Sequence, residues 1–309
     1  MYGDKTVRIL VLGSSGMAGH VVTLYLERNP RLFVCNLADR KALNSRTVLL
    51  DVRELETFGR YLDDMNFDVI VNCIGILNRS AEERKDEAVF LNAFLPHFLE
   101  KKYRNTAARL IHISTDCVFS GETGGYTEAA FKDGDSFYAR TKAVGEVINE
   151  KDLTFRTSII GPDMNPEGIG LFNWFMKSEG EIQGFAGAIW TGVTTMELAR
   201  AVEAAVFSRL AGLYHLVPES SISKYELLVL MQAVFGRREL IIKRDDTYST
   251  DKSLVNSRKD FQLELPSYKE MLKGMKCWID EHGELYPQYL GRGDTPLPSA
   301  GCASRYVPF

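Results

Sequence analysis

The sequence of 309 residues predicts an α/β protein, with a doubly wound parallel sheet followed by a smaller C-terminal part. Short apolar runs that suit buried strands alternate with amphipathic helical patterns through residues 7–160. Such alternation produces parallel strands joined by right-handed crossovers. After Gly161-Pro162 the alternation stops, and glycines and aromatic residues become frequent. We therefore expect a first domain at residues 1–161, to which 193–211 returns, and a second domain at 162–309.

A glycine-rich turn follows the first predicted strand, residues 7–12. Gly13, Gly16 and Gly19 stand in this turn, before an amphipathic helix and a second strand at 32–37. Such glycines allow a tight turn, close approach of the backbone to a pyrophosphate, and close packing of helix on strand. The spacing is GxxGxxG rather than GxGxxG, and a glycine cluster alone is often only a loop, but the flanking strand and helix favour a dinucleotide site. The expected cofactor contacts in this turn are Gly13, Ser15, Gly16, Met17 and Gly19.

Further strands are expected at 48–52, 68–74, 109–114 and 153–160, with one long helix at 86–104 that Pro96 is placed to kink. Two of these strands end in candidate cofactor residues. Asp51 and Val52 close one strand, where the carboxylate could meet an adenine edge. Cys73, Ile74 and Gly75 close another, where a glycine lets the cofactor lie against the backbone. The alternative is that the polar groups only cap the strand ends.

The candidate catalytic residues are Thr115, Tyr138 and Lys142. If the segment after Phe137 is helical, Tyr138 and Lys142 lie one turn apart on the same face. The ammonium then favours phenolate and lowers the phenol pKa from its reference of about 10, which makes Tyr138 a credible proton donor. Thr115 ends an apolar run, so its hydroxyl is expected at the carboxyl end of a strand, where ligands bind in open α/β sheets. Alone, such a Tyr–Lys pair is more often a solvated contact, and only the other motifs favour catalysis.

The C-terminal part is predicted from weaker signals. Residues 163–192 contain glycines and aromatic residues that suit a loop-rich substrate wall better than a strand. The tail from Tyr286 lacks periodicity and is expected to be extended or partly disordered. The regular elements expected between them are a helix at 194–210, a strand at 212–217 and a helix at 224–235.

Composition and charge narrow the class of protein. The net charge of −4 and the pI near 5.8 argue against a general surface for nucleic acid or for an anionic membrane. No apolar run approaches the roughly 20 residues that span a bilayer, and the N-terminus lacks the shape of a signal peptide. The five cysteines are scattered without a CxxC, which suits reduced thiols in a cytosol better than disulfides or a zinc site. We expect a cytoplasmic enzyme without a metal site.

Together the motifs resemble the extended short-chain dehydrogenase/reductase family, and within it the dTDP-4-dehydrorhamnose reductase group, over nearly all of residues 6–285. Besides the three glycines of the turn, the motifs are Ser114-Thr115-Asp116-x-Val118-Phe119-x-Gly121, Tyr138-x-x-x-Lys142, Arg156-Thr157-Ser158, Trp190-Thr191-Gly192 and Gly212-x-Tyr214-His215. The resemblance implies a Rossmann sheet and an NAD(P)H-dependent reductase that acts on a keto-sugar nucleotide. A homodimer is expected.

The resemblance also implies a role for each site residue. Tyr138 is the general acid, Lys142 binds the nicotinamide ribose and tunes the phenol, and Thr115 hydrogen-bonds the reacting oxygen. The C-terminal part supplies the nucleotide-sugar pocket. The implied substrate-binding residues are Asp116, Cys117, Trp190 and Thr191.

Departures from the family bear on rival chemistries. The 4,6-dehydratases carry Thr-Asp-Glu at this strand end, where this chain has Cys117, so their carboxylate base is missing. GDP-fucose synthases have a Cys there and a His after a later Gly-Pro, where this chain has Asp163. The only cation expected near Cys117 is Lys142, so its thiol should stay protonated. Cys117 is therefore interpreted as a packing residue, and His112 and His215 as core histidines.

Two alternatives to the reductase stay open. One is a nucleotide-sugar epimerase with bound NAD. The other is a non-catalytic subunit, because the regulatory subunit of methionine adenosyltransferase resembles the same group.

The second strand bears on the choice of cofactor. An NAD enzyme of this type usually places an acidic side chain at the end of this strand to accept the ribose hydroxyls. Asn36 stands near that point, and Asp39 and Arg40 follow. Arg40 could pair with a 2′-phosphate in a contact worth roughly 1.5–3 kcal/mol, whereas Asp39 argues for NAD. The sequence therefore favours NADP(H) over NAD(H).

Overall fold

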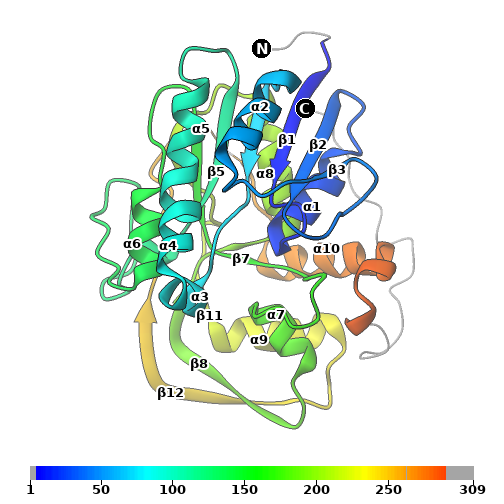
Figure 1. Cartoon of the computed structure of the whole chain (residues 1–309). Helices are drawn as coiled ribbons and strands as arrows, with labels where there is room; N and C mark the ends of the chain where they lie inside the picture. The colour runs from blue at the N-terminus through cyan, green and yellow to red at the C-terminus, as the bar shows by residue number, and fades with distance from the viewer. Residues whose placement is uncertain (1–4, 262, 290–309) are drawn as a thin grey trace.

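The computed structural model describes residues 5–261 and 263–289. Its main sheet has seven parallel strands in the order β10-β6-β5-β4-β1-β2-β3 (Figure 1). Because β2 lies on one side of β1 and β4 on the other, the sheet is doubly wound, and the predicted Rossmann-like α/β fold is confirmed. The strands are β1 (Val7–Leu12), β2 (Leu32–Ala38), β3 (Thr47–Leu49), β4 (Val69–Asn72), β5 (Arg109–Thr115), β6 (Leu153–Thr157) and β10 (Gly212–His215).

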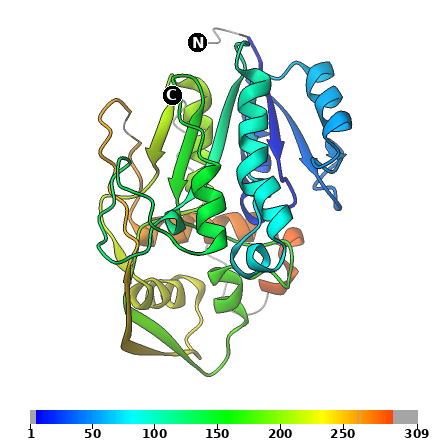
Figure 2. The same ribbon diagram turned by 60° about the vertical axis from the view of Figure 1, so that its left-hand side comes forward.

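Helices cover both faces of this sheet (Figure 2). Side chains alternate along β1, so Ile9 and Val11 enter the core on one face, while Leu10 and Leu12 enter the core on the other. Both cores consist mainly of apolar side chains, as expected of a parallel sheet that is buried on two sides. The first face carries α1 (Met17–Leu26) and α8 (Thr195–Phe207), and the second carries α2 (Leu55–Met65) and α5 (Leu95–Tyr103), with α6 (Phe137–Val144) beside them.

A smaller sheet lies beyond the carboxyl ends of the main strands (Figures 1 and 2). Its strand order is β11-β8-β12, with β12 parallel and β11 antiparallel to β8. The short strands β7 and β9 pair beside it. The elements of this part are β7 (Ile159–Ile160), α7 (Leu171–Lys177), β8 (Glu181–Trp190), β9 (Val193–Thr194), β11 (Ile222–Ser223), α9 (Lys224–Phe235), β12 (Ile241–Asp251) and α10 (Tyr268–Glu281).

The loop-rich wall predicted at 163–192 is wrong, because this segment contains α7 and the ten-residue strand β8. Glycines misled the prediction, although here they allow close packing rather than a loop. A Cβ at Gly184 would lie 2.9 Å from Tyr225 Cα, and one at Gly187 would lie 2.8 Å from Tyr248 O. These glycines therefore let α9 and β12 approach β8 closely.

The long helix predicted at 86–104 forms with a change of pitch inside it. It consists of α4 (Lys85–Ala88), a π-helical segment η1 (Val89–Phe94) and α5. Pro96 lies in the first turn of α5, directly after the widened turn, where its missing N–H leaves no hydrogen bond to lose. The carbonyl of Asn92 in this turn lies against Gly145, where a Cβ would stand 1.8 Å away. The remaining short helices are α3 (Asn78–Glu83), η2 (Asp116–Val118), η3 (Gly283–Leu285) and η4 (Pro287–Tyr289).

Several strand boundaries are shorter than predicted. The run at 153–160 breaks into β6 and β7, the run at 48–52 gives only β3, and the run at 212–217 gives β10. No helix of the described part is long and apolar enough to cross a membrane. Cys35, Cys73 and Cys117 are free thiols, while Cys302 lies outside the described residues.

The start of the tail contradicts the prediction. Tyr286 and Tyr289 are buried, and the Tyr286 hydroxyl lies 2.6 Å from His20 Nε2 and accepts a hydrogen bond from Trp278 Nε1 at 2.9 Å. Aromatic residues without a periodic pattern gave no signal for this packing against α1. Residues 290–309 lie outside the described part of the chain.

Candidate active site

Thr115 and Tyr138 meet at the carboxyl end of the main sheet. Thr115 is the last residue of β5, and Tyr138 stands in the first turn of α6, whose N-cap Ser136 accepts a hydrogen bond from Ala139 N at 3.0 Å. The Thr115 side chain acts on the Tyr138 phenol and lowers its pKa, so the two groups lie close to each other. Both side chains are nearly buried, with 8% and 6% of their surface exposed. The fold therefore brings the predicted acid and its predicted neighbour close together.

Lys142 lies one turn along α6 from Tyr138 and is buried. Its Nζ donates to the Ile113 carbonyl at 2.7 Å and lies 3.5 Å from His112 Nε2. Asn72 Nδ2 lies 3.2 Å from the other ring nitrogen of His112, at the end of β4. Burial lowers the pKa of Lys142 to about 8. The ammonium is thus held toward the interior of the sheet.

The expected effect of Lys142 on Tyr138 is wrong in this structure. Burial raises the pKa of the Tyr138 phenol, Cys117 and Asp116 raise it further, and the nearby Thr115 side chain lowers it. Lys142 is not among the groups that shift this pKa, because its ammonium is directed to the Ile113 carbonyl. A phenol with a raised pKa is fully protonated at neutral pH, which is the state that a proton donor requires.

The predicted cofactor turn after β1 is closely packed around its glycines. Gly13 has φ +81°, which favours glycine, and a Cβ there would lie 3.0 Å from Ile74 Cγ1. A Cβ at Gly19 would lie 2.1 Å from Gly13 O. Helix α1 begins after the N-cap Gly16 with no side-chain cap, so its first amides are available to a phosphate. Ser15 and Met17 stand between these glycines, and both are half-buried.

The residues at the ends of β2 and β3 lie differently from the prediction. Strand β2 continues to Ala38, and Asn36 is buried and bonded to Asn44, so Asp39 is the first side chain beyond the strand. Arg40 is 89% exposed, and its Nε lies 3.1 Å from Asp39 Oδ2.

The carboxylate of Asp51 is paired with Arg53 at 2.7 Å, which lowers the pKa of Asp51. Val52 is buried in the apolar core with α2, so its side chain serves packing. At the end of β4, Ile74 N donates to Asn72 Oδ1 at 3.1 Å, and burial raises the pKa of the Cys73 thiol to about 12. Gly75 follows at the exposed edge.

Asp116 and Cys117 follow Thr115 in the turn η2. The Thr115 hydroxyl donates to Asp116 Oδ1 and accepts from Cys117 N, both at 3.1 Å. Burial raises the pKa of Asp116, and burial together with the Asp116 carboxylate raises that of Cys117 to about 12. The Cys117 thiol is therefore protonated at neutral pH.

Two lysines that the sequence interpretation missed complete this side of the site. Lys224 Nζ lies 4.6 Å from the centre of the Trp190 ring, and both Lys224 and Lys252 act on the Asp116 carboxylate. Trp190 itself is buried against Tyr268, and Thr191 accepts a hydrogen bond from Leu254 N at 2.8 Å. Lys224 opens a helix that was predicted, but only the pairing of β11 with β8 shows that it reaches Trp190. The expectation that Lys142 is the only cation near Cys117 is wrong, because Lys252 also acts on its thiol.

Comparison with known protein families shows the family of the chain. The family model described as RmlD substrate binding domain matches residues 7–243, which is more than half of the sequence. The chain belongs to the RmlD substrate binding domain family.

Individual relatives match at modest identity. A dTDP-4-dehydrorhamnose reductase of Mycobacterium tuberculosis is 30% identical over 149 residues, 46% of this chain and 45% of that protein. The spore coat polysaccharide biosynthesis protein SpsK of Bacillus subtilis is 24% identical over 247 residues, 76% and 82% of the two chains. The methionine adenosyltransferase 2 subunit beta of Rattus norvegicus is 29% identical over 141 residues, 45% and 41%. The chain thus spans less than half the length of the first and third of these proteins.

Solved structures share the fold of this RmlD family member. The dTDP-4-dehydrorhamnose reductase of Bacillus anthracis in complex with NADP has a TM-score of 0.75 at 21% identity, covering 89% of this chain and 99% of that chain. The dTDP-glucose 4,6-dehydratase of the same species in complex with NAD has a TM-score of 0.71 at 15% identity, covering 91% and 99%.

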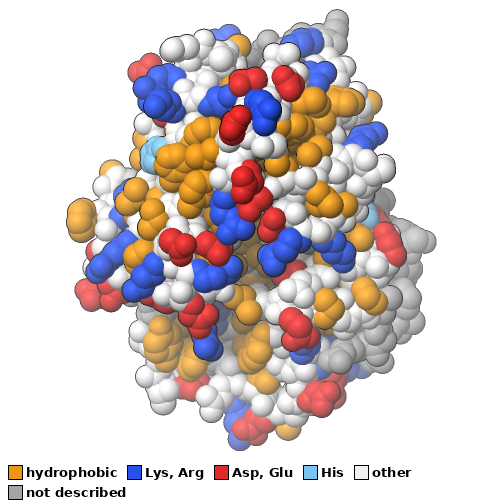
Figure 3. Space-filling view, in the orientation of Figure 1, with side chains coloured by type: hydrophobic (Ala, Val, Ile, Leu, Met, Phe, Trp, Pro, Cys, Tyr) orange, Lys and Arg blue, Asp and Glu red, His pale blue; other side chains and the backbone are white. Residues whose placement is uncertain are grey.

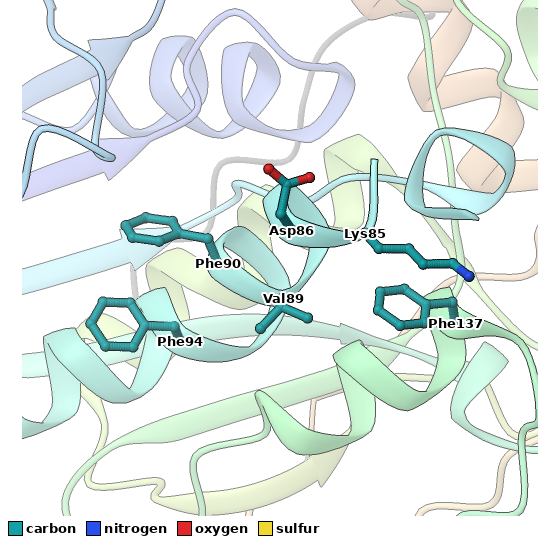
Figure 4. A pocket seen from close by; sticks show the side chains of 6 residues that line it. All are labelled: Lys85, Asp86, Val89, Phe90, Phe94 and Phe137. Atoms are coloured by element: carbon teal, nitrogen blue, oxygen red, sulfur yellow. The ribbon is translucent and has the colours of Figure 1, made fainter. Parts of the chain in front are cut away.

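A hollow of this RmlD family member lies on the outer helices (Figure 4). It opens between η1 and the start of α6, and Lys85 Nζ lies 5.5 Å from the centre of the Phe137 ring. Its lining residues are Lys85, Asp86, Val89, Phe90, Phe94 and Phe137. Among the described residues, no group of three His, Cys, Asp or Glu side chains is arranged to hold a metal ion.

Proposed function

We propose that this protein is an NAD(P)H-dependent reductase that reduces the keto group of a sugar nucleotide, with Tyr138 as the general acid. The observation that carries the proposal is the placement of two buried side chains, Thr115 and Tyr138, beside each other at the carboxyl end of β5. Ligands of open α/β sheets bind at this edge. A buried, protonated phenol beside a second hydroxyl group is suited to protonate a forming alkoxide.

Each residue of the site has its own proposed role in this reaction. The Thr115 hydroxyl orients the substrate oxygen and the phenol together, and Tyr138 transfers its proton to that oxygen. Lys142 is proposed to bind the nicotinamide ribose. The glycine turn holds the cofactor diphosphate through the free amides of α1. The nicotinamide, when bound, supplies the hydride.

NADP(H) is proposed as the preferred cofactor, with Arg40 as the partner of the 2′-phosphate. The exposed guanidinium stands directly after β2 and needs no rearrangement of the core to meet a phosphate. Asp39 pairs with Arg40, so a 2′-phosphate would compete with this carboxylate. The preference is therefore expected to be modest.

The test of the assigned acid is Tyr138→Phe, with turnover of keto-sugar nucleotides as the readout. Loss of a positioned acid should lower kcat by at least about a hundredfold, while the Kd of NADPH stays near wild type. Tyr248→Phe, at a half-exposed position on β12, is a matched control that should leave both values unchanged. Normal turnover by Tyr138→Phe would show that another group donates the proton.

A non-catalytic binding subunit is the second candidate function, and the similarity to methionine adenosyltransferase 2 subunit beta favours it. The same experiment separates the two candidates. A wild-type protein that reduces no keto-sugar nucleotide, yet binds a protein partner tightly, would replace the reductase with the binding subunit.

We also propose that the protein is a homodimer, formed through the outer helices η1 and α6. Val89 and Phe94 are 47% and 43% exposed on η1, and Val144 and Ile148 are 64% and 59% exposed in and after α6. Exposed apolar side chains gathered on one face are typical of a protein interface. Figure 3 shows hydrophobic side chains over this side of the molecule. Light scattering of wild type and Phe94→Glu tests this, since the variant should be monomeric.

A further inference from the structure

Lys224 carries an ammonium that the described residues leave without a hydrogen-bond acceptor. Strand β11 pairs with β8 so that Ile222 stands opposite Trp190, and the chain then enters α9 with Lys224 as its first residue. This register places Nζ over the indole ring, 4.6 Å from its centre. The side chain is half-buried, so its ammonium can be reached from solvent. Its three N–H donors are therefore available to an anionic ligand.

Lys252 reaches the same place from another segment. Asp251 N donates to Gly121 O at 2.7 Å, and Leu254 N donates to Thr191 Oγ1 at 2.8 Å. Lys252 therefore lies between the segment that follows β5 and the end of β8. Like Lys224, it has no hydrogen-bond acceptor for its Nζ among the described residues. The carboxyl groups whose pKa it lowers are those of the exposed Asp133 and the buried Asp116.

Positive charge exceeds negative charge around Asp116. Two ammonium groups act on this one buried carboxyl group, and burial disfavours the charged form of both Asp116 and Lys224. A second anion would offset the unfavourable burial of the lysine charge and would supply the missing acceptors. Figure 3 shows a hollow in the surface between the main sheet and the smaller part, with Lys and Arg side chains beside it.

The positions of the two lysines and of the Tyr138 phenol indicate which end of the ligand faces each of them. Asp116 and Cys117 act on the Tyr138 phenol, whereas neither Lys224 nor Lys252 does. Both lysines lie beside the end of β8, in the smaller part, whereas the phenol lies on α6 beside the main sheet. In a sugar nucleotide the diphosphate is attached at the anomeric end, apart from the carbonyl group that is reduced.

We propose that Lys224, assisted by Lys252, binds the diphosphate of the sugar nucleotide while the keto carbon faces Tyr138. The proposal rests on the proposed function for the identity of the substrate. It makes Lys224 a binding residue that sets how far the sugar extends into the site. The competing explanation is that Lys224 only neutralises Asp116 and stabilises the fold.

Calorimetric titration with dTDP and UDP, and with thymidine and uridine as uncharged counterparts, separates these explanations. The variants are Lys224→Gln, Lys224→Arg and Lys252→Gln, with Lys243→Gln on β12 as a matched exposed control. Loss of a charge-assisted contact should weaken diphosphate binding by Lys224→Gln about tenfold or more, and nucleoside binding should not change. Lys224→Arg should stay within about threefold of wild type, and Lys252→Gln should weaken binding several-fold. NADPH affinity should be unchanged in all variants.

Salt provides a second readout that a purely structural lysine would not affect. Added salt should weaken diphosphate binding by wild type more steeply than by Lys224→Gln, because one ionic contact is missing in the variant. Equal diphosphate affinity in wild type and Lys224→Gln would overturn the proposal, as would equal loss of nucleoside binding or a wild type that binds no nucleoside diphosphate. If Lys224→Gln does not fold, the retained affinity of Lys224→Arg and the loss in Lys252→Gln decide. A wild type that binds diphosphates through Lys224 but reduces no keto-sugar refutes the reductase alone.

Discussion

Replacing Gly19 by alanine tests whether the glycine turn is built for close packing rather than for flexibility. The added Cβ would lie 2.1 Å from Gly13 O and 2.7 Å from Gly13 C, where ordinary contact begins at 3.4 Å. Both obstructing atoms belong to the backbone, so no rotation of a side chain can relieve the overlap. Helix α1 would have to move away from the end of β1.

The size of the effect follows from two opposing terms. Overpacking of a well-packed interior costs about 1–3 kcal/mol, and here the rigid backbone places the cost in the upper part of this range or above it. Alanine is a better helix former than glycine by about 1 kcal/mol, which offsets part of the cost. We expect Gly19→Ala to lower the free energy of unfolding by about 2 kcal/mol.

Gly59→Ala is the matched control, because Gly59 lies within α2 and an added Cβ there would have no other atom within 4 Å. It should raise the free energy of unfolding by up to about 1 kcal/mol. Urea unfolding of wild type and both variants measures these changes, and fluorescence titration with NADPH measures cofactor affinity. Gly19→Ala should bind NADPH about tenfold more weakly, because the shifted turn displaces the amides at the N-terminus of α1. If Gly19→Ala matched Gly59→Ala in stability and wild type in affinity, the turn would not depend on this contact.

Three further predictions concern cofactor choice, pH and rival chemistry. Calorimetry should show that wild type binds NADPH about tenfold more tightly than NADH, and that Arg40→Ala binds the two cofactors equally. If wild type and Arg40→Ala both bound NADPH and NADH equally, Arg40 would not select the cofactor. Burial lowers the pKa of His20 to about 4, below its unfolded value of 6.5, so the unfolded state takes up the extra proton and stability falls as pH drops from 6.5 to 4. Urea unfolding at pH 7.5 and 5 should show a loss of about 2 kcal/mol from this residue, reduced in His20→Gln, and an unchanged midpoint would contradict the burial argument. Turnover in D₂O, corrected with an enzyme-free control, should leave the ring carbons beside the former carbonyl unlabelled, whereas enzyme-dependent deuterium that is lost in Cys117→Ser would restore the epimerase.

The main sheet could be predicted because its signals are local. Strand β1 and the glycines after it follow one another in sequence. Burial on both faces makes each central strand a continuous apolar run, which is easy to recognise. Thr115 and Tyr138 were found for the same reason, since each stands at a recognisable end of an element.

The smaller part was harder to predict because its signals depend on contacts between distant segments. Gly184 and Gly187 indicate a loop when considered alone, and only the approach of Tyr225 and Ser249 gives them a place in β8. For the same reason the sequence did not predict that Lys224 lies over Trp190, since this position follows from strand pairing rather than from any spacing in the sequence.

The groups around Cys117 bear on whether the protein is a reductase or an epimerase. Cations near a cysteine would ordinarily favour the thiolate, and such a thiolate could abstract a proton from a carbon beside the keto group. Here burial and the adjacent Asp116 carboxylate outweigh Lys252, and the pKa of the thiol rises to about 12. The positive charge of the two lysines is therefore available to an anionic substrate and not to a base. Hydride transfer with protonation by Tyr138 requires no such base, so the arrangement that weakens the epimerase explanation is the same one that favours a reductase.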